Sequence, residues 1–266
     1  MEGSRGLGDV YKRQAENDET TESFPDPSRW LDHASDADAL AIMADDQSGA
    51  IAAIRHAMPE IEAAAMAAFN RLHSGSGRLI YAGAGTSIRI GVQDGVELTP
   101  TFGWPRDRTG FLIAGGPDAL MRSVEGAEDS ADAGMDAVKA ALVKADDVVI
   151  GLAASGSTPF TCAVLSEARK RGALSIGIAN NPDGRVQAVA EIGITLATGG
   201  EVVAGSTRMK AGTAQKICLN MISTLIMVRM GKVRNGMMVA MQASNAKLRQ
   251  RQKRIDAALQ SGITPQ

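Results

Sequence analysis

Short apolar runs bounded by glycine or polar residues recur along the middle of the chain. Each run is about four to eight residues long, which is typical of strands buried on both faces of a sheet. Stretches with apolar residues at helical spacing, such as 159–170, separate most of the runs. The alternation predicts an α/β fold in which helices cover both sides of a parallel sheet. The predicted strands are 78–82, 111–114, 147–154, 173–178 and 192–196.

Helical patterns flank this strand region. Residues 36–72 are rich in alanine, and Pro59 is expected to begin a new helix within them. Residues 206–230 predict a long, mostly apolar helix that Gly231 ends. Its apolar residues cover most of its circumference, which predicts burial on nearly all sides and a second subunit against it. Residues 237–259 are expected to form a final, increasingly basic helix.

The two ends of the chain differ from the middle. Residues 1–14 lack the apolar core of a signal peptide and resemble translated sequencing-adapter sequence, so we exclude them from the fold as a non-native artefact. Residues 15–35 are polar and contain prolines, which predicts a flexible arm. The expected organisation is one domain with N-terminal helices over 36–235, followed by a C-terminal helix over 236–266.

Composition narrows the possible functions. The formal net charge of −2 gives no indication of nucleic acid or an acidic membrane surface as a partner. Cys162 and Cys218 lie in apolar helical patterns and are expected to be buried, reduced thiols. The histidines lack the spacing of a metal site, and we expect neither a metal nor a cofactor. No run resembles a membrane span of about 20 apolar residues, and with no export signal we expect a cytoplasmic protein.

Two glycine-rich loops, 83–87 (GAGTS) and 154–159 (ASGSTP), directly follow predicted strands. Ligands of a parallel sheet bind beyond the carboxyl ends of its strands. Glycine lets the backbone approach an anion, and the helix start that follows presents free N–H groups. With their hydroxyl side chains, the loops suit a phosphate monoester on a sugar. The residues expected to bind it are Gly85, Thr86, Ser87, Ser155, Gly156, Ser157 and Thr158.

Other interpretations of these loops fit less well. A dinucleotide fingerprint needs a third glycine, and Ile88 occupies that position. A Walker loop needs a lysine after its last glycine, and neither loop has one. Plain strand-to-helix turns remain open for either loop alone, but they account poorly for two hydroxyl-rich loops together.

Two glutamates, Glu97 and Glu128, follow in the sequence as a candidate acid/base pair. Val96 and Leu98 flank Glu97, which favours apolar surroundings and a protonated carboxyl. Glu128 stands among other acids near a predicted helix start. A surface carboxylate for Glu97, and a capping or dipole role for Glu128, stay open. The combination predicts proton transfer on a phosphorylated sugar.

Three blocks of the sequence resemble the N-acetylmuramic acid 6-phosphate etherases of the sugar isomerase (SIS) family. They are GAGTSIRIGVQDGVELTPTFG at 83–103, VEGAEDS at 124–130 and EVVAGSTRMKAGTAQKICLNMISTLIMVRMGKV at 201–233, here called the third block. The resemblance implies a three-layer SIS fold, a homodimer, and cleavage of a lactyl ether on a 6-phosphorylated amino sugar in peptidoglycan recycling. It also implies that Glu97 protonates the departing lactate and that Glu128 removes the C2 proton.

The third block contributes further candidates. Ser206, Arg208 and Lys210 are expected either to contact the substrate carboxylate or phosphate or to brace the dimer, with equal support. The basic run of the final helix is expected to be a solvated face, with a phosphate or partner contact as the alternative. This run comprises Lys247, Arg249, Arg251, Lys253 and Arg254.

The chain departs from the family pattern at several positions. Ile88 stands where the family usually has glycine, Leu98-Thr99 replace a usual Cys-Pro, and Ser157 replaces an arginine that is often found. The chain ends at Gln266, before the small C-terminal helical domain of many members. We therefore expect either a truncated chain or a divergent branch with a changed substrate.

Two other functions stay open. The first is a SIS-type sugar-phosphate isomerase, many of which use a histidine; His33, His56 and His73 all precede the first loop, which disfavours this function. The second is a non-catalytic sugar-phosphate-binding regulator, which would keep the loops and need neither glutamate. The presence of both glutamates favours the enzyme.

Overall fold

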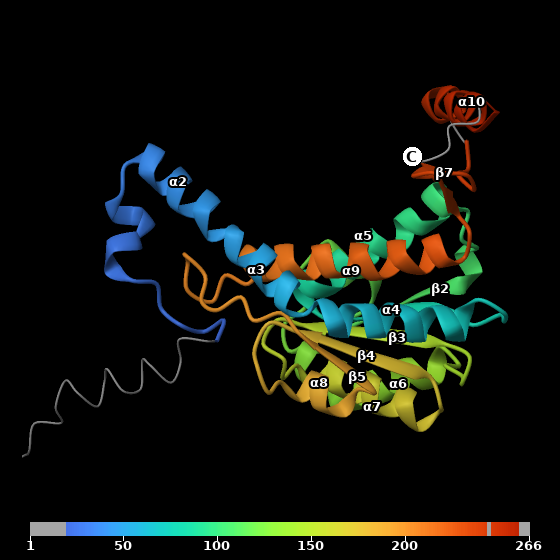
Figure 1. The fold of residues 1–266 in the computed structure, drawn as a ribbon. Coiled ribbons are helices and arrows are strands. Elements are labelled where there is room, and N and C mark those ends of the chain that lie inside the picture. Colours follow the sequence, from blue (N-terminus) through green and yellow to red (C-terminus); the bar gives the residue numbers. More distant parts are fainter. Residues whose placement is uncertain (1–19, 244–245, 261–266) are drawn as a thin grey trace, which may run out of the picture.

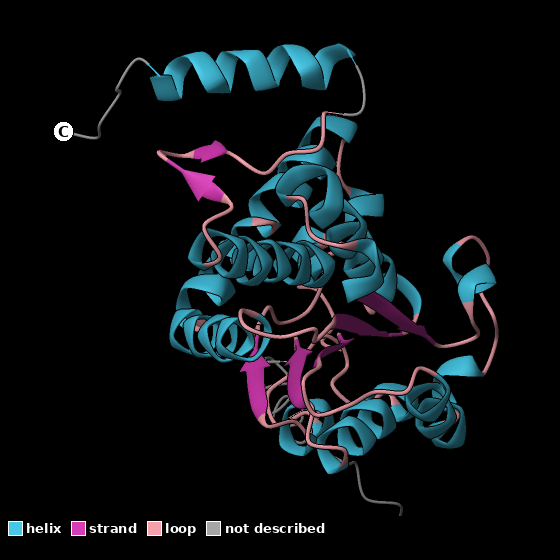
Figure 2. Ribbon diagram, turned by 90° about the vertical axis from the view of Figure 1, so that its right-hand side faces the viewer, coloured by secondary structure: helices cyan, strands magenta, loops and turns pink. Residues whose placement is uncertain are grey.

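The computed structural model describes residues 20–243 and 246–260, so the expected artefact at 1–14 lies outside the described residues. A five-stranded parallel sheet forms the centre, in the order β2-β1-β3-β4-β5 (Figures 1 and 2). All five predicted strands and the parallel sheet are confirmed. The strands are β1 (Leu79–Gly83), β2 (Thr109–Ile113), β3 (Val148–Ala153), β4 (Leu174–Ala179) and β5 (Ile192–Thr195).

One face of the sheet carries α4 (Met58–Leu72), α5 (Gly85–Phe102) and α9 (Lys210–Arg229). Side chains from these helices and from the strands form a single apolar cluster, because each strand presents alternate residues to this face. As predicted, Pro59 lies in the first turn of α4, and Gly231, at φ 72°, follows the end of α9.

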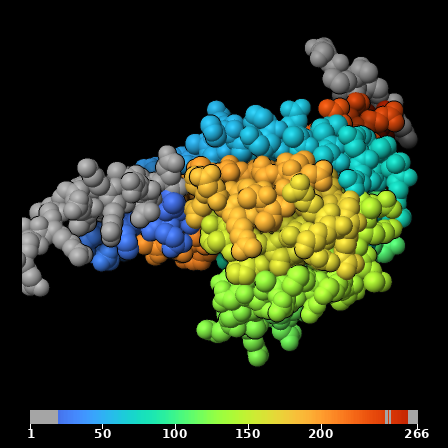
Figure 3. Space-filling model, turned by 90° about the horizontal axis from the view of Figure 1, so that it is seen from below, coloured from blue at the N-terminus to red at the C-terminus, as the bar shows by residue number. Residues whose placement is uncertain are grey.

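The other face carries α6 (Ala131–Ala140), α7 (Pro159–Lys170) and α8 (Arg185–Val189), which are seen from outside in Figure 3. A second apolar cluster, which includes Cys162, fills the space beneath them. The sheet thus lies between two helical layers, and the three-layer α/β fold expected from the sequence is confirmed. Cys162 and Cys218 are both buried and free, as expected.

Glycines bring α5 unusually close to the sheet. A Cβ on Gly95 would lie 2.7 Å from the Phe111 ring, and one on Gly91 would lie 3.2 Å from Tyr81 Cβ. Any larger residue at Gly95 would have to displace aromatic rings in the core. Ile88, at the position where a dinucleotide site would need its third glycine, is fully buried.

A buried carboxylate joins α5 to its neighbours. Asp94 accepts hydrogen bonds from Tyr81 Oη at 2.6 Å, from Asn220 Nδ2 of α9 at 2.7 Å and from Ser223 Oγ of α9 at 3.1 Å. Burial, and then the charge of Asp94, raise the pKa of Tyr81 well above its ordinary value. The phenol therefore stays a donor, and α5 is fixed to both β1 and α9.

Helix α9 is shorter than predicted, and a single chain covers only part of its apolar surface. It begins at Lys210 rather than at 206. Leu219 and Ile222 are buried, whereas Ile217 and Met221 are only partly buried against the core. By length and composition α9 could cross a membrane, but more than half of it is buried in this domain.

The prediction of a single C-terminal helix is wrong for its first residues, which do not belong to a helix. A small hairpin of β6 (Val233–Arg234) and β7 (Met237–Met238) precedes α10 (Ala246–Gln260), which stands apart from the sheet (Figures 1 and 2). The hairpin turn is Asn235-Gly236, with φ of 51° and 73°. Asn-Gly between apolar residues is the strongest short-range hairpin signal, because both turn positions need positive φ.

The N-terminal part is more ordered than a flexible arm. Short 3-10 helices η1 (Pro27–Arg29) and η2 (Leu31–His33) lead into α2 (Asp36–Asp46) and α3 (Ser48–His56). Thr21 is fully buried against the rest of the domain. Within the described residues from 20 onward, Thr21 and Ser23 are buried, whereas residues 24–35 of the expected arm are exposed or half-buried.

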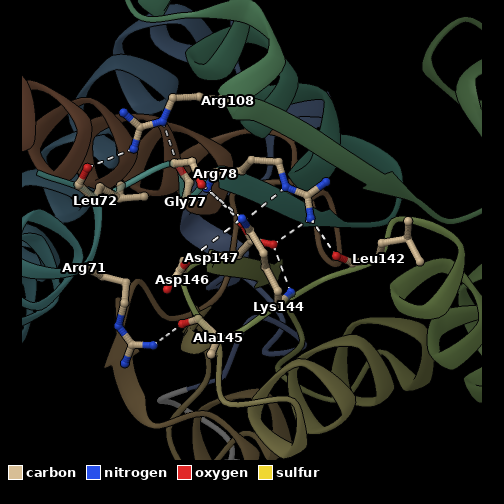
Figure 4. A network of polar contacts seen from close by, with 11 residues as sticks. Arg71, Leu72, Gly77, Arg78, Arg108, Leu142, Lys144, Ala145, Asp146 and Asp147 are labelled. Carbon is tan, nitrogen blue, oxygen red and sulfur yellow. Dashed lines mark hydrogen bonds and ion pairs between the residues drawn. The ribbon is translucent and has the colours of Figure 1, made fainter. Parts of the chain in front are cut away.

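A polar network closes the edge of the sheet where the strands begin (Figure 4). The fully buried carboxylate of Asp147 accepts hydrogen bonds from Arg78 N, Nε and Nη2, the last at 2.6 Å, and from Lys144 N. Nearby, Arg108 donates to the carbonyls of Leu72 and Gly77 at 2.8 and 2.7 Å. This edge is therefore held by charged side chains bonded to loop backbone.

Candidate functional site

The two glycine-rich loops lie side by side at the carboxyl edge of the sheet. Strands β1 and β3 are neighbours in register, with Gly83 opposite Leu152. The loops that follow them lead directly into α5 and α7, so the N-termini of both helices point toward this edge. Gly85 and Gly156 have φ of 53° and 76°, a conformation that glycine adopts without strain. A Cβ on Gly85 would meet no heavy atom within 4 Å, so the backbone there faces open space.

The hydroxyl groups of the loops differ in exposure. Ser87, in the first turn of α5, is 8% exposed, whereas Ser155 and Ser157 are exposed. Ser157 N donates to Ser155 Oγ at 3.3 Å, so the second loop is folded back on itself. The structure thus brings together backbone amides, short hydroxyls and two helix N-termini, which suits a phosphate monoester.

The start of the third block lies beside the first loop. A Cβ on Gly212, in the first turn of α9, would lie 3.7 Å from Thr86 Cγ2. Ser206 is half-buried and Arg208 is exposed in the segment that leads into α9. The carboxylate of Glu201 accepts hydrogen bonds from the backbone N–H of Lys210 and Ala211 at 3.0 and 2.9 Å. This helix N-terminus is therefore already occupied by an internal anion.

Lys210 is engaged in the interior. Its Nζ lies 3.0 Å from Asp46 Oδ1 and donates to the carbonyl of Gly200 at 2.7 Å, and the residue is only 6% exposed. Asp46 also lies 3.6 Å from Arg29 Nη2. In the described chain Lys210 braces the N-terminal helices against the start of α9. The expected alternative of a substrate contact therefore has no geometric support.

Glu128 lies at the same edge as the loops. It belongs to η5 (Ala127–Asp129), which packs against α7, and a Cβ on Gly115 at the end of β2 would lie 3.2 Å from Ala127 Cβ. Its side chain is exposed. The cap of α6 is supplied by Ser130, whose Oγ accepts from Ala133 N at 3.1 Å. The capping role left open for Glu128 thus belongs to its neighbour.

Glu97 lies elsewhere in the same chain. It follows Gly85 by twelve residues of continuous helix, about 18 Å along the α5 axis at 1.5 Å per residue. Glu97 is exposed and so is Val96, at 54%. Within one chain, Glu97 is therefore neither beside the loops nor in apolar surroundings, and this part of the expectation is wrong. The helix carries it toward the opposite edge of the sheet.

Helices α5 and α9 pack side by side in the helical layer on one face of the sheet. Glu97 lies one helical turn beyond Asp94, whose carboxylate accepts from Asn220 of α9. Glu97 is thus presented on the outer helical layer. Among residues 20–243 and 246–260, no three His, Cys, Asp or Glu side chains are grouped closely enough to hold a metal ion.

We expect single hydroxyl deletions in the loops to weaken phosphate binding. Ser87→Ala and Ser155→Ala should each reduce affinity for a hexosamine 6-phosphate by about tenfold, because each would lose one hydrogen bond to a charged group. Isothermal titration calorimetry measures this effect. Ser48→Ala is the matched control, since its hydroxyl bonds only the Asp45 carbonyl at the start of α3. Wild-type affinity in either loop variant would exclude that serine as a phosphate ligand.

Two family profiles match this chain. One is described as the N-terminal SIS domain of glucokinase regulatory protein and matches residues 61–169. The other is the SIS domain, which matches residues 127–225. Among solved structures, the chain is similar to a phosphoheptose isomerase from Francisella tularensis, at a TM-score of 0.53 and 17% identity over 73% of this chain and 98% of that one. It is also similar to the sugar isomerase domain of an RpiR transcription factor from Sphaerobacter thermophilus, at 0.52 and 17% over 82% and 98%.

Closer similarity comes from curated bacterial relatives. The chain is 50% identical over 216 residues to the N-acetylmuramic acid 6-phosphate etherase of Deinococcus radiodurans, covering 81% of this chain and 70% of the relative. It is 46% identical over 238 residues to the enzyme of the same name from Streptomyces coelicolor, covering 90% and 76%. The solved structures, at much lower identity, show the fold alone.

Proposed function

The chain belongs to the family of N-acetylmuramic acid 6-phosphate etherases, and we propose that it cleaves the D-lactyl ether of N-acetylmuramic acid 6-phosphate to give N-acetylglucosamine 6-phosphate and D-lactate. One observation carries the proposal. In a chain half identical to such an etherase, two hydroxyl-bearing glycine loops meet at the carboxyl edge of the sheet with a glutamate on the adjoining segment.

The chemistry needs an acid and a base. In the open-chain sugar, the C1 carbonyl makes the C2 proton acidic. A base removes that proton, and lactate leaves from C3 when an acid protonates its oxygen. Water then adds to C3 of the unsaturated aldehyde, and a proton returns to C2. Each proton transfer contributes about 10²–10⁴-fold to the rate.

Glu128 is the proposed C2 base, supported by its position at the edge that carries both loops. Glu97 is the proposed acid for the leaving lactate. The stretch of α5 between the first loop and Glu97 is longer than a hexose 6-phosphate. A sugar bound at the loops of one chain is therefore out of reach of the Glu97 of that same chain. We therefore assign Glu97 to the site of a second copy, so that each site is built from two chains.

A homodimer is supported by an unfilled apolar groove. The groove, of about 800 Å³, lies between α4 and α9, on the helical layer that also presents Glu97. Glu62 and Arg229 line it too, and a two-fold axis would allow each to face the other on the second copy. The apolar lining is Met58, Pro59, Ile61, Met66, Ile217, Met221, Leu225 and Val228.

Introducing a charge into this groove is expected to separate the subunits. Met221→Asp should halve the mass in solution at micromolar concentration and abolish lactate release, because an aspartate would be desolvated in an apolar interface. Light scattering coupled to gel filtration gives the mass. Leu40→Asp is the control, since Leu40 is exposed on α2. A wild-type protein that is already a monomer would contradict the homodimer.

The activity itself has a direct test. The protein is incubated with N-acetylmuramic acid 6-phosphate, and released lactate is measured with D-lactate dehydrogenase. Stoichiometric D-lactate and N-acetylglucosamine 6-phosphate support the proposal, and binding without turnover would indicate a regulator instead. Because the substrate is a phosphorylated sugar of peptidoglycan, we also propose a cytoplasmic role in peptidoglycan recycling.

A further inference from the structure

Residues 20–23, here called the strap, lie across the carboxyl edge of the sheet. Thr21 is fully buried and Ser23 is 9% exposed. The strap runs between the second glycine loop and the segment that begins the third block, and Figure 3 shows the blue N-terminal part against this orange segment. Ordering such a polar segment costs conformational freedom, which specific contacts must offset.

The first set of contacts connects the strap to the second loop. Asn181 Oδ1 accepts from Thr21 N at 2.7 Å, and Asn181 Nδ2 donates to Thr21 Oγ1 at 3.1 Å. The same Nδ2 donates to the carbonyl of Ser155 at 3.2 Å. Thr21 thus bonds both the oxygen and the nitrogen of the Asn181 side-chain amide, and that nitrogen also bonds the loop.

The contact from Asn181 holds the second glycine loop at the peptide bond between Ser155 and Gly156. The carbonyl of Ser155 and the N–H of Gly156 belong to one planar peptide. Asn181 holds the carbonyl side, and the carbonyl of Ala153 accepts from Gly156 N at 3.0 Å on the other side. With both sides held, the plane of the Ser155–Gly156 peptide is set within the second glycine loop.

The second set of contacts connects the strap to residues 200–205, around the start of the third block. A Cβ on Gly200 would lie 2.7 Å from the carbonyl oxygen of Ser23, so only glycine lets the strap pass there. The carbonyl of Gly200 is in turn held by Lys210 Nζ at 2.7 Å. Further on, a Cβ on Gly205 would lie 3.9 Å from Glu22 Oε2. The strap therefore contacts two of the elements that surround the site.

We propose that the strap is part of the sugar-phosphate site, in which Thr21 is a positioning residue that sets the second glycine loop through Asn181. The proposal rests on the proposed function for the identity of the ligand. Thr21 does not touch the phosphate; it holds the amide that orients the loop backbone. Loss of its hydroxyl should loosen ligand binding and leave proton transfer at C2 and C3 largely unchanged.

Two independent variants perturb the strap. Thr21→Val keeps the shape of the side chain and removes the hydroxyl that accepts from Asn181, and Thr21→Ser restores it. Gly200→Ala drives a methyl group into the Ser23 carbonyl and displaces the strap without altering Thr21 or Asn181. Ser28→Ala is the control, because it removes a hydrogen bond to Asp26 that lies exposed in the same N-terminal part.

The test is binding of N-acetylglucosamine 6-phosphate by titration calorimetry, together with KM and kcat for lactate release. Thr21→Val and Gly200→Ala should each weaken binding and raise KM about fivefold, the size of one net hydrogen bond, with kcat within about twofold. Thr21→Ser and Ser28→Ala should match the wild type. Thermal melts confirm that each variant is folded.

The outcomes separate the two proposals. Wild-type affinity in both Thr21→Val and Gly200→Ala would overturn the role of the strap, as would a loss confined to kcat. If the wild type binds N-acetylglucosamine 6-phosphate but releases no lactate, the proposed activity fails while the binding comparison still tests the strap. If Thr21→Val does not fold, the affinity and KM of Gly200→Ala decide the result.

Discussion

Replacing Glu128 with alanine is expected to abolish both exchange of the substrate C2 hydrogen with deuterated water and release of lactate. Each rate should fall by about 10²–10⁴-fold, because removal of the C2 proton precedes every later step. Exchange is followed by NMR of the C2 position, and lactate by an enzymatic assay. Wild-type lactate release by Glu128→Ala would remove Glu128 from the mechanism.

Glu97→Ala is expected to separate the two steps. The variant should still exchange the C2 hydrogen while releasing lactate about 10²–10⁴-fold more slowly, because only departure of lactate needs the acid. If Glu97→Ala also abolishes exchange in a folded protein, the division of roles is wrong, and one glutamate serves both steps. Glu125→Ala, in the same exposed segment as Glu128, is the matched control and should retain both activities.

Asp147→Ala is expected to destabilise the domain by about 3 kcal/mol. The substitution removes four hydrogen bonds that the buried carboxylate accepts and leaves the Arg78 guanidinium partly buried without its partner. Urea unfolding followed by circular dichroism measures the change. Asp146→Ala is the control, because Asp146 is an exposed carboxylate whose partner Lys144 lies at 3.8 Å. A loss below 1 kcal/mol in Asp147→Ala would contradict the role of this network.

The same carboxylate predicts a dependence on pH. Burial acts to raise the pKa of Asp147, but the hydrogen bonds from Arg78 and Lys144 outweigh burial and hold the pKa below its ordinary value of 3.8. A lowered pKa in the folded state stabilises the protein fully above the unfolded value, and this contribution is lost as the pH falls through the folded value. The wild type should therefore lose stability below about pH 4 more steeply than Asp147→Ala.

The sheet and its loops follow from local sequence. Each strand is a short apolar run, and the register of β1 and β3 then places both glycine loops at one edge. The Asn235-Gly236 hairpin could also have been found, because the turn signal lies in the sequence. It is missed because residues 237–259 are assigned to a helix as a whole.

Other features depend on contacts between distant residues. The burial of Thr21 comes from Asn181, 160 positions away, and nothing in a polar, proline-bearing segment reveals that partner. The sequence offers the charge of Lys210 as a possible ligand contact. In the structure Lys210 pairs with Asp46, 164 positions away, and acts as an internal brace. Glu97 is close to the first loop in sequence, but the residues between them form a continuous helix, which separates the two by its length.

The length of α5 between the first loop and Glu97 has a genetic consequence. If each site takes Glu97 from one copy and Glu128 from the other, two inactive alleles can restore each other. In a mixed dimer of Glu97→Ala and Glu128→Ala, one site carries both defects, and the other carries none. Random pairing in a cell that expresses both alleles equally would give about one quarter of the wild-type number of intact sites. Growth on the amino sugar would then depend on co-expression, although neither allele supports it alone.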